Sequence, residues 1–307
     1  MPSEPAAAVV VATKDRPEDV VVVVRSILAN PDPELCVVVV DQSEDDATTD
    51  ALAGEIDDRR LLVLSTEEIG KGRALNRGVA ATRSRYVLFT DDDCEVEPGW
   101  AGRMTRVFDE HPNAGAVFCR VVGGPHDPAA GFIPTYGVEQ DHVWASIRAR
   151  RHRGLGAGMG VRRAVLDTIG GFDELLGPGS RFPSADDADL ALRVLGAGHH
   201  VVDTAATEVV HHGFRSWTQG VALTRRDFVA LGGMYGKALR LRPWSILPQF
   251  LVMVAWELGL SPFLTAARRR QRPVGLRRVV YFWEGVVDAF RVPLDRERGV
   301  FRADHTE

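Results

Sequence analysis

Cysteine is scarce in this 307-residue chain, and lysine is equally scarce. Three cysteines at wide spacing, Cys36, Cys94 and Cys119, fit neither a disulfide framework nor a zinc site, and they favour a reducing compartment. The only lysines are Lys14, Lys71 and Lys237, and all other Lys/Arg positions are arginine. We interpret this as compositional bias, so an isolated arginine carries little functional information.

A strong net charge is also missing. The net charge is −5 and 26% of residues are charged, which is ordinary for a soluble globular protein and makes nucleic acid an unexpected partner. No basic residues precede the first apolar run, so the N-terminus is predicted to form a strand and not a secretory signal. The length allows one large domain, or a domain with an appendage.

One long apolar segment, Ser245 to Ala267, is followed by basic residues up to Arg272. Gln249, Glu257 and two prolines interrupt it, and a carboxylate near the middle of a membrane span is costly. A buried or interfacial helix is therefore favoured over a transmembrane one, and the basic residues suit an anionic membrane surface. We expect a cytoplasmic protein, with peripheral membrane contact through residues 245–291 and a homodimer interface as open alternatives for this tail.

Strands and helices are predicted to alternate through the first half of the chain. Apolar, β-branched runs predict strands at 6–13, 35–43, 60–66 and 85–90, with helices at 16–30, 45–56 and 71–84 between them. This order indicates an α/β fold with a mostly parallel sheet flanked by helices, in which ligands bind at the carboxyl ends of the strands. Further along we predict a strand at 114–124, a short helix between turns in 154–174, an amphipathic helix at 186–198, two short strands in 199–213, and helices from Trp217 with a boundary near 240–243.

Three adjacent carboxylates, Asp91, Asp92 and Asp93, follow the fourth predicted strand. Like charges this close repel one another, so the stretch is either a solvated acidic turn or a site for a cation. Two carboxylates at i and i+2 suit Mg²⁺ or Mn²⁺, which prefer oxygen ligands. The position at a strand's carboxyl end makes the metal site as plausible as the solvated turn.

Three other stretches each give only weak evidence of a functional site when considered alone. Lys71 lies between two glycines just before a helix, where backbone N–H groups favour phosphate, although the Walker spacing is absent and no GxGxxG follows the first strand. Asp186 and Asp187 open the amphipathic helix, where helix capping or a general base would each explain a carboxylate. His211 and His212 end a strand and point to opposite faces, so at most one can face a site.

Taken in order, these stretches resemble the family 2 glycosyltransferases, which have a GT-A (Rossmann-like) fold. The resemblance covers about residues 6–240 and rests on TKDRPED, DQSEDD, GKGRALNRG, the DDD turn, GGFDE, DDADLALR and VVHHG. It implies a catalytic domain over 1–240, with nucleotide-sugar binding in about 1–120 and acceptor binding and the base in 121–240. A helical extension would then occupy 241–307.

The resemblance also implies roles for individual residues. Nucleotide-sugar contacts are expected from Thr13, Asp15, Arg16, Asp41, Ser43, Lys71, Arg73 and Asp92. A divalent cation, Mg²⁺ or Mn²⁺, would be held by Asp91, Asp93 and His211. The acceptor side would include Gly171, Phe172 and Asp173. Asp187 would be the catalytic base, beside Asp186.

Two departures from the family pattern concern Asp186, which replaces the usual Glu, and Gln42, which replaces a Gly. The first leaves open which carboxylate reaches the acceptor. The resemblance implies transfer of a sugar from a UDP, GDP or dTDP sugar to a glycan, lipid-linked or small-molecule acceptor, with inversion, in cell-wall or polysaccharide biosynthesis. A sugar-nucleotide pyrophosphorylase would carry a Gly-rich, Arg-containing loop after the first strand, and a non-catalytic nucleotide-sugar-binding protein would be expected to lose the base or the metal carboxylates.

Overall fold

The computed structural model describes residues 6–30, 35–148, 154–260 and 277–302. Its main strands are β1 (Ala7–Thr13), β2 (Leu35–Asp41), β3 (Leu61–Ser65), β4 (Tyr86–Phe89), β5 (Cys94–Val96), β6 (Ala114–Gly123), β8 (His142–Trp144), β9 (Met159–Arg162) and β10 (His200–His211). Short strands add β7 (Gly131–Phe132) paired with β11 (Arg215–Ser216), and β12 (Leu294–Asp295) paired with β13 (Val300–Phe301).

The helices are α1 (Pro17–Leu28), α2 (Ala47–Glu55), α3 (Lys71–Ala80), α4 (Trp100–Glu110), α5 (Arg163–Ile169), α6 (Asp186–Gly196), α7 (Trp217–Leu241), α8 (Pro243–Met253) and α10 (Arg277–Ala289). A 3₁₀ turn, η1 (Gly156–Gly158), and a π-helical segment, η2 (Val254–Leu260), complete the described elements.

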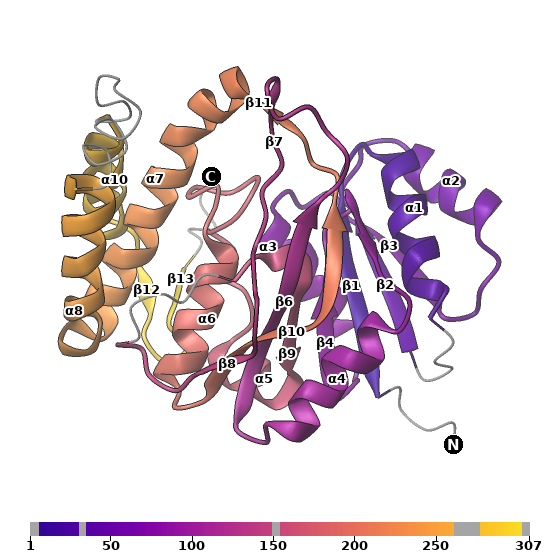
Figure 1. The fold of residues 1–307 in the computed structure, drawn as a ribbon, viewed down its shortest axis with the longest axis horizontal. Coiled ribbons are helices and arrows are strands. Elements are labelled where there is room, and N and C mark those ends of the chain that lie inside the picture. The colour runs from indigo at the N-terminus through magenta and orange to yellow at the C-terminus, as the bar shows by residue number, and fades with distance from the viewer. Residues whose placement is uncertain (1–5, 31–34, 149–153, 261–276, 303–307) are drawn as a thin grey trace.

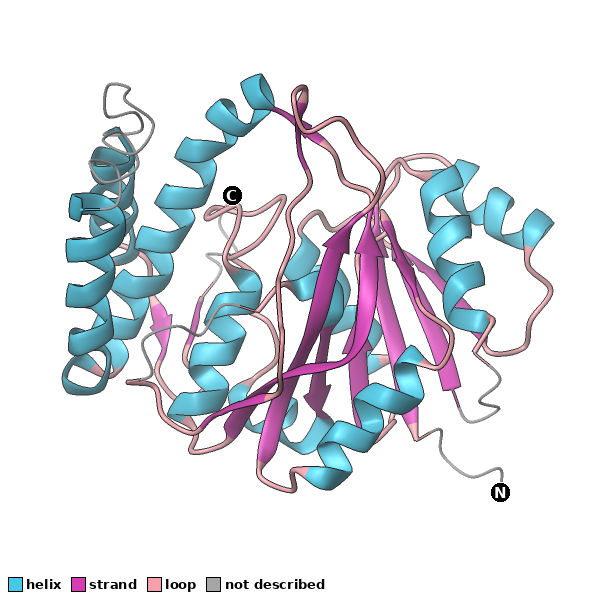
Figure 2. Ribbon diagram, viewed as in Figure 1, coloured by secondary structure: helices cyan, strands magenta, loops and turns pink. Residues whose placement is uncertain are grey.

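The central sheet has nine strands, and its main path runs β3-β2-β1-β4-β9-β6-β10-β5, with β8 on β10. The strands β3, β2, β1 and β4 are parallel to one another, as are β6 and β10, whereas β9 is antiparallel to both β4 and β6. Figures 1 and 2 show the sheet at the centre, with helices on both of its faces. The predicted α/β class and sheet arrangement are confirmed.

Side chains alternate between two cores because successive residues of a strand point to opposite faces. On β1, Val9 and Val11 pack with α1, α2 and α4, whereas Val10 packs with α3, α5 and α6. Each core is built mainly from valine, leucine and phenylalanine. A strand with both faces covered by helices must be apolar along its whole length, which explains the continuous apolar runs in the sequence.

Two details of the second half differ from the prediction. Residues 199–213, predicted as two short strands, form one long strand, β10, which is irregular between Thr204 and Glu208 where its register with β6 shifts. The glycine-rich stretch before α5, predicted as a turn, contains the buried strand β9. Position 160 within β9 requires glycine, because a Cβ on Gly160 would lie 2.7 Å from the Leu88 side chain.

The C-terminal helices form a third hydrophobic core with residues that precede them in the chain. Phe182 and Leu192 join α7, α8 and α10 in this core. The sequence predicts a domain boundary near residue 240, but α7 before that boundary packs along α10 after it. The division of the chain at residue 240 stays a prediction. Within the described ranges, no helix combines the length and apolar character needed to cross a membrane. The end of the long apolar segment and the basic residues after it lie outside those ranges.

Candidate active site

A cleft of about 420 Å³ opens at the carboxyl ends of β1 and β4, a volume in the range of small-molecule sites. The polar ends of these strands meet here, as their parallel order requires. Its lining includes the predicted site residues Thr13, Arg16, Lys71, Asp91, Asp92, Asp93, Asp186, Asp187 and His211. Residues that are 198 positions apart in the chain are thus brought together, from Thr13 on β1 to His211 at the end of β10.

Asp92 contacts Thr13, the last residue of β1, and Arg16, which directly precedes α1. The Thr13 hydroxyl donates to Asp92 Oδ2 at 2.9 Å, and Arg16 Nη1 donates to Asp92 Oδ1 at 2.8 Å. Burial and the negative charge of Asp93 raise the pKa of Asp92 to about 6, although the positive charge of Arg16 lowers it. This carboxylate is therefore partly protonated near neutral pH when no further cation compensates it.

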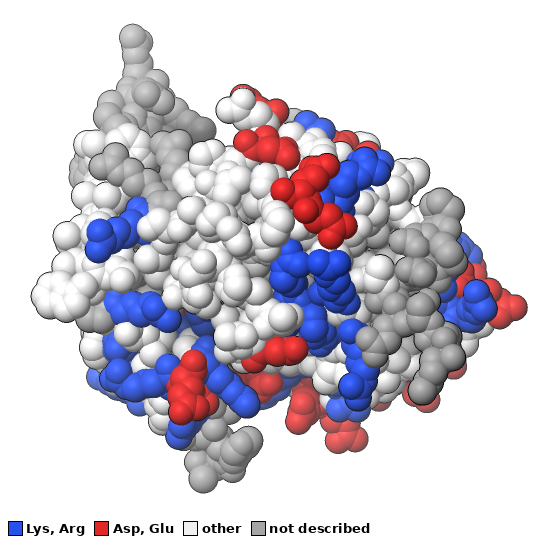
Figure 3. All heavy atoms as spheres, turned by 90° about the horizontal axis from the view of Figure 1, so that it is seen from below, with Lys and Arg blue, Asp and Glu red and all other residues white. Residues whose placement is uncertain are grey.

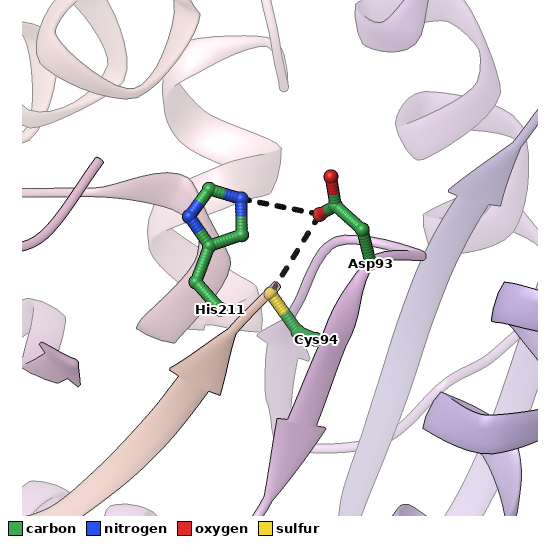
Figure 4. Close-up of side chains that lie close together, drawn as sticks. All are labelled: Asp93, Cys94 and His211. Carbon is green, nitrogen blue, oxygen red and sulfur yellow. Dashed lines mark hydrogen bonds and ion pairs between the residues drawn. The ribbon is translucent and has the colours of Figure 1, made fainter. Parts of the chain in front are cut away.

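Asp93 faces His211, as Figure 4 shows. Asp93 Oδ1 lies 3.2 Å from His211 Nε2, and Arg16 Nη1 lies 3.2 Å from Asp93 Oδ2. Burial opposes ionisation, but the hydrogen bond and charge of His211, with the charge of Arg16, lower the pKa of Asp93 to about 2. The same contact raises the pKa of His211 in spite of its burial.

The residues here fit a hard or borderline divalent cation. His211 Nδ1 donates to the Pro134 carbonyl at 3.0 Å, which leaves Nε2 directed at Asp93, the arrangement usual for a metal-binding imidazole. Ligand atoms of Asp93, Cys94 and His211 all lie within 4.8 Å of one another. Burial and the charges of Asp91 and Asp93 raise the pKa of the Cys94 thiol. Sulfur is a soft ligand, less suited to Mg²⁺ or Mn²⁺ than carboxylate oxygen. A carboxylate and an imidazole suit Mn²⁺.

Lys71 connects the two groups of carboxylates in the cleft. Its Nζ forms an ion pair with Asp91 Oδ1, and the charges of Asp186 and Asp187 act on it as well. Burial alone would lower the pKa of Lys71, but these three carboxylates together raise it above its ordinary value. Lys71 therefore stays charged at all physiological pH values.

Gln42 holds the loop that presents Lys71. Its side-chain amide donates to the backbone carbonyls of Glu68 and Gly70, the latter at 3.3 Å. Gly70 has a φ of +131°, which strains any residue with a side chain. The departure from the family pattern at Gln42 thus has a structural consequence, because this side chain connects β2 to the start of α3.

Asp187 is anchored by backbone donors at the start of α6. The Gly156 N–H donates to Asp187 Oδ2 at 2.9 Å, and the Ala188 N–H donates to Oδ1 at 2.6 Å. Burial, followed by the charge of Asp186, raises the pKa of Asp187 to about 7 in spite of the compensating Lys71. The pKa of Asp186 is raised as well, mainly by burial.

The residue before this pair is strained. Ala185 has a φ of +66°, in the left-handed region, which costs a non-glycine residue roughly 1–2 kcal/mol. Strain of this kind is often found at functional sites, where the surrounding structure enforces it. Here it turns the chain sharply into α6, so that Asp186 and Asp187 both reach the cleft.

Four predicted donor-site residues lie behind or beside the cleft. Asp41 accepts from the Ser43 hydroxyl at 2.5 Å, and the Ser43 hydroxyl in turn accepts from the Asp15 backbone N–H at 2.8 Å. This connects the loops after β1 and β2. Arg73 lies on α3, with its Nε 3.6 Å from Glu174 Oε2. Their contacts with a nucleotide stay predictions.

The predicted acceptor-side turn, Gly171 to Asp173, makes contacts that are internal to the fold. Asn76 of α3 accepts from the Phe172 N–H at 2.8 Å and donates to the Phe172 carbonyl at 3.0 Å. Asp173 is buried and pairs with Lys237 Nζ at 2.5 Å. Phe172 is also buried, so an acceptor role for this turn stays a prediction.

Sequence reasoning missed Arg215 and Arg226, which also line the cleft from β11 and α7. In a chain rich in arginine they carry no distinguishing signal. The scarce lysines are more informative. Lys14 and Lys71 line the cleft, and Lys237 is buried between two carboxylates. Because lysine is rare in this chain, these three positions stand out in the sequence as the arginine positions do not.

Solved structures with this fold define its class. A mannosyltransferase of Pyrobaculum calidifontis, solved with GDP-Man and Mn²⁺, superposes with a TM-score of 0.63 at 20% identity, covering 94% of this chain and 88% of that one. Residues 1–349 of S. aureus TarS, solved with UDP-GlcNAc, give a TM-score of 0.61 at 15% identity over 93% and 80%. The chain therefore has the GT-A fold.

Residues 8–170, more than half of the chain, match glycosyl transferase family 2. The chain belongs to this family. It is 28% identical over 234 residues to the O-antigen biosynthesis protein RfbC of Myxococcus xanthus, over 68% of this chain but only 17% of that protein. It is 27% identical over 217 residues to the glucosyl-dolichyl phosphate glucuronosyltransferase of Haloferax volcanii, over 67% and 68%.

Proposed function

We propose that this chain transfers a sugar from a nucleotide-diphosphate sugar to an acceptor hydroxyl, with a divalent cation and with inversion at the anomeric carbon. The proposal rests on one observation. Asp91–Asp93 and Asp187 line the same cleft, and the charge of Lys71 lies between them. Lys71 Nζ and Asp187 Oδ2 lie 3.8 and 3.7 Å from the position that a Cβ on Gly156 would take. A site for charge compensation and a site for proton transfer are thus adjacent.

In the proposed reaction, the acceptor oxygen attacks the anomeric carbon, and the bond from that carbon to the diphosphate oxygen breaks with its electron pair. Asp187 takes the proton of the acceptor hydroxyl, and its raised pKa of about 7 suits a base working near neutral pH. Lys71 and Arg16 supply positive charge next to the diphosphate. A divalent cation held by Asp93 and His211, with Asp91 nearby, would stabilise the negative charge of the leaving group as a Lewis acid.

We propose inversion because a single displacement at the anomeric carbon needs no covalent intermediate between the sugar and the protein. A single displacement requires only a base on the face of the sugar opposite to the diphosphate. Asp187 and Asp93 come from different elements, α6 and the loop after β4, and both line the cleft. Asp187 is anchored by two backbone N–H groups, an arrangement that suits a base held in position.

The relatives support the substrate class. The two solved neighbours named above are complexes with GDP-Man and with UDP-GlcNAc, both nucleotide-diphosphate sugars. Relatives are named for O-antigen and succinoglycan biosynthesis, which fits a glycan or lipid-linked acceptor in polysaccharide synthesis. We further propose a catalytic domain over residues 1–240 followed by a helical extension.

Release of the nucleotide diphosphate from UDP-, GDP- and dTDP-sugars, with and without Mn²⁺, tests this function. We expect release from one nucleotide class only, dependent on Mn²⁺ and abolished by EDTA. NMR of the product's anomeric proton then reports inversion or retention. Formation of a nucleotide sugar from a nucleoside triphosphate and a sugar 1-phosphate would favour a pyrophosphorylase instead. Binding of the donor without any turnover would favour a non-catalytic protein.

A further inference from the structure

A second pocket, of about 440 Å³, lies at the far end of α6 from the candidate active site. α6 begins at the cleft with Asp186 and Asp187, and its later residues Leu192 and Arg193 line this pocket. The remaining walls come from the end of α5, the end of α7 and the turn between β12 and β13. We call it the α6–α7 pocket.

Positive charge dominates the α6–α7 pocket. Its charged lining consists of Arg193, Lys237, Arg242, Arg296 and Arg298, with Asp189 and Glu297 as the carboxylates. Figure 3 views the molecule from below Figure 1, toward the lower ends of α6 and α7, and it shows basic side chains gathered around an acidic patch at the lower left of that face. The cations in this lining outnumber the carboxylates by more than two to one.

Arg193 lines the pocket and has one guanidinium nitrogen, Nη2, without a hydrogen-bond acceptor among the described residues. Its side chain is 8% exposed, its Nε donates to Asp189 Oδ2 at 2.8 Å, and its Nη1 donates to the carbonyls of Ile169 and Gly171 at 2.9 and 2.7 Å. Its buried Nη2 has no hydrogen-bond partner among the described residues. A buried guanidinium N–H without an acceptor is costly, and the oxygen of a bound water or of a ligand would relieve that cost.

Three exposed arginines, Arg242, Arg296 and Arg298, also line the pocket. A Cβ on Gly170 would lie 2.7 Å from the Arg298 Cβ, and a Cβ on Gly196 would lie 3.2 Å from Arg242 Nε. Arg296 lies on the same turn as Arg298. Among the residues that the structure describes, Arg242, Arg296 and Arg298 form no ion pair.

The helix dipole explains only part of this charge. The C-terminal end of α6 favours cations, which accounts for Arg193 and Arg242 near it. It does not account for Arg296 and Arg298, which another segment brings to the same opening. Lys237 and Arg193 pair with buried carboxylates, so the positive charge that the described part of the chain leaves without an ion pair here is that of the three exposed arginines.

We propose that the α6–α7 pocket binds a phosphate-bearing ligand, a diphosphate or phosphomonoester, with a phosphate oxygen at Arg193 Nη2 and the three exposed arginines around it. Guanidinium groups match phosphate oxygens in geometry and charge. Ile147, Leu192 and Leu241 supply an apolar wall for the rest of the ligand. Two sources share this chemistry, a free phosphorylated metabolite and a phospholipid headgroup. The proposal does not depend on the proposed function, because the pocket is separate from the cleft.

Titration of the full chain with inorganic pyrophosphate, followed by calorimetry in EDTA, tests the site. EDTA removes divalent cations, and the carboxylates of the active-site cleft then repel an anion, so binding there is suppressed. The test variant is Arg242→Gln/Arg296→Gln/Arg298→Gln, three exposed positions whose change leaves the core intact. The matched control, Arg77→Gln/Arg83→Gln/Arg106→Gln, removes the same charge from exposed positions elsewhere.

We expect one pyrophosphate per wild-type chain, binding weaker by about tenfold or more in the test variant, and unchanged binding in the control, since charge-assisted hydrogen bonds dominate such sites. Equal binding by wild type and test variant, equal loss in both triple variants, or no binding by wild type would each overturn the proposal. Sedimentation with vesicles of equimolar phosphatidylcholine and phosphatidic acid identifies the source. Wild-type binding that pyrophosphate displaces indicates a lipid headgroup, and pyrophosphate binding without vesicle binding indicates a free metabolite.

Discussion

Replacing Asp187 by asparagine separates its catalytic role from its structural one. The asparagine has nearly the same shape but cannot take a proton from the acceptor. General base catalysis contributes roughly 10²–10⁴-fold. We therefore expect kcat to fall by about that factor, with little change in the affinity for the nucleotide diphosphate, because the cation site at Asp93 and His211 is untouched.

The effect of this substitution on stability is worked from the two backbone contacts of Asp187. Asparagine keeps an acceptor for only one of the N–H groups of Gly156 and Ala188, which costs roughly 1.5–3 kcal/mol. Removal of a buried negative charge next to Asp186 offsets that loss. The free energy of unfolding should therefore change little, so that a loss of activity cannot be attributed to unfolding.

The raised pKa of Asp187 also sets the sign of the pH dependence. A base with a pKa of about 7 is protonated at lower pH, so kcat/KM of the wild type should rise roughly tenfold per pH unit up to about pH 7 and then level off. The protonated form is the one that the fold favours. Its contribution to stability is complete below the ordinary carboxyl pKa and is lost as the pH rises through about 7.

The assay is donor-dependent transfer measured from pH 5 to 9, with Asp186→Asn as the matched variant. Asp186 is also buried at the start of α6 and lines the same cleft. Near-wild-type turnover by Asp187→Asn would refute its role as base. A larger loss in Asp186→Asn would transfer that role to Asp186, and a flat wild-type profile between pH 6 and 8 would refute the argument from the pKa.

Three further predictions concern the cation site and the core. Asp93→Ala should abolish Mn²⁺-dependent binding of nucleotide diphosphates in calorimetry, and undiminished binding would exclude Asp93 as a ligand. Lys237→Met should lower the free energy of unfolding by about 3–5 kcal/mol in urea denaturation, because it leaves the carboxylates of Asp173 and Asp189 buried without this ammonium; an unchanged midpoint would contradict this. Gly285→Ala should destabilise by about 1–3 kcal/mol, since its Cβ would lie 1.9 Å from the Val229 carbonyl oxygen and force α10 away from α7. Gly102→Ala, with nothing within 4 Å, is its control and should show no loss of stability.

Much of the sheet could be predicted from the sequence because burial on both faces leaves a local signature. The valine runs around Val9 and Val38 are apolar without alternation, and few other environments tolerate that pattern. The antiparallel strand β9 could not be predicted in this way. Its four residues contain a glycine and follow a glycine-rich turn, and it is a strand only because β4 and β6 on either side supply hydrogen-bond partners.

The sequence by itself determined that the residues following the first and fourth strands lie at one edge of the sheet, because parallel strands end there together. Asp91–Asp93 and Thr13 meet there for this reason. Only the tertiary structure decided which charge each carboxylate faces: Asp91 pairs with Lys71, Asp92 with Arg16, and Asp93 with His211. Adjacent aspartates are chemically identical in the sequence. The pKa of Asp92 is raised and that of Asp93 is lowered because burial and the nearest cation differ between the two, and those neighbours come from segments distant in the chain.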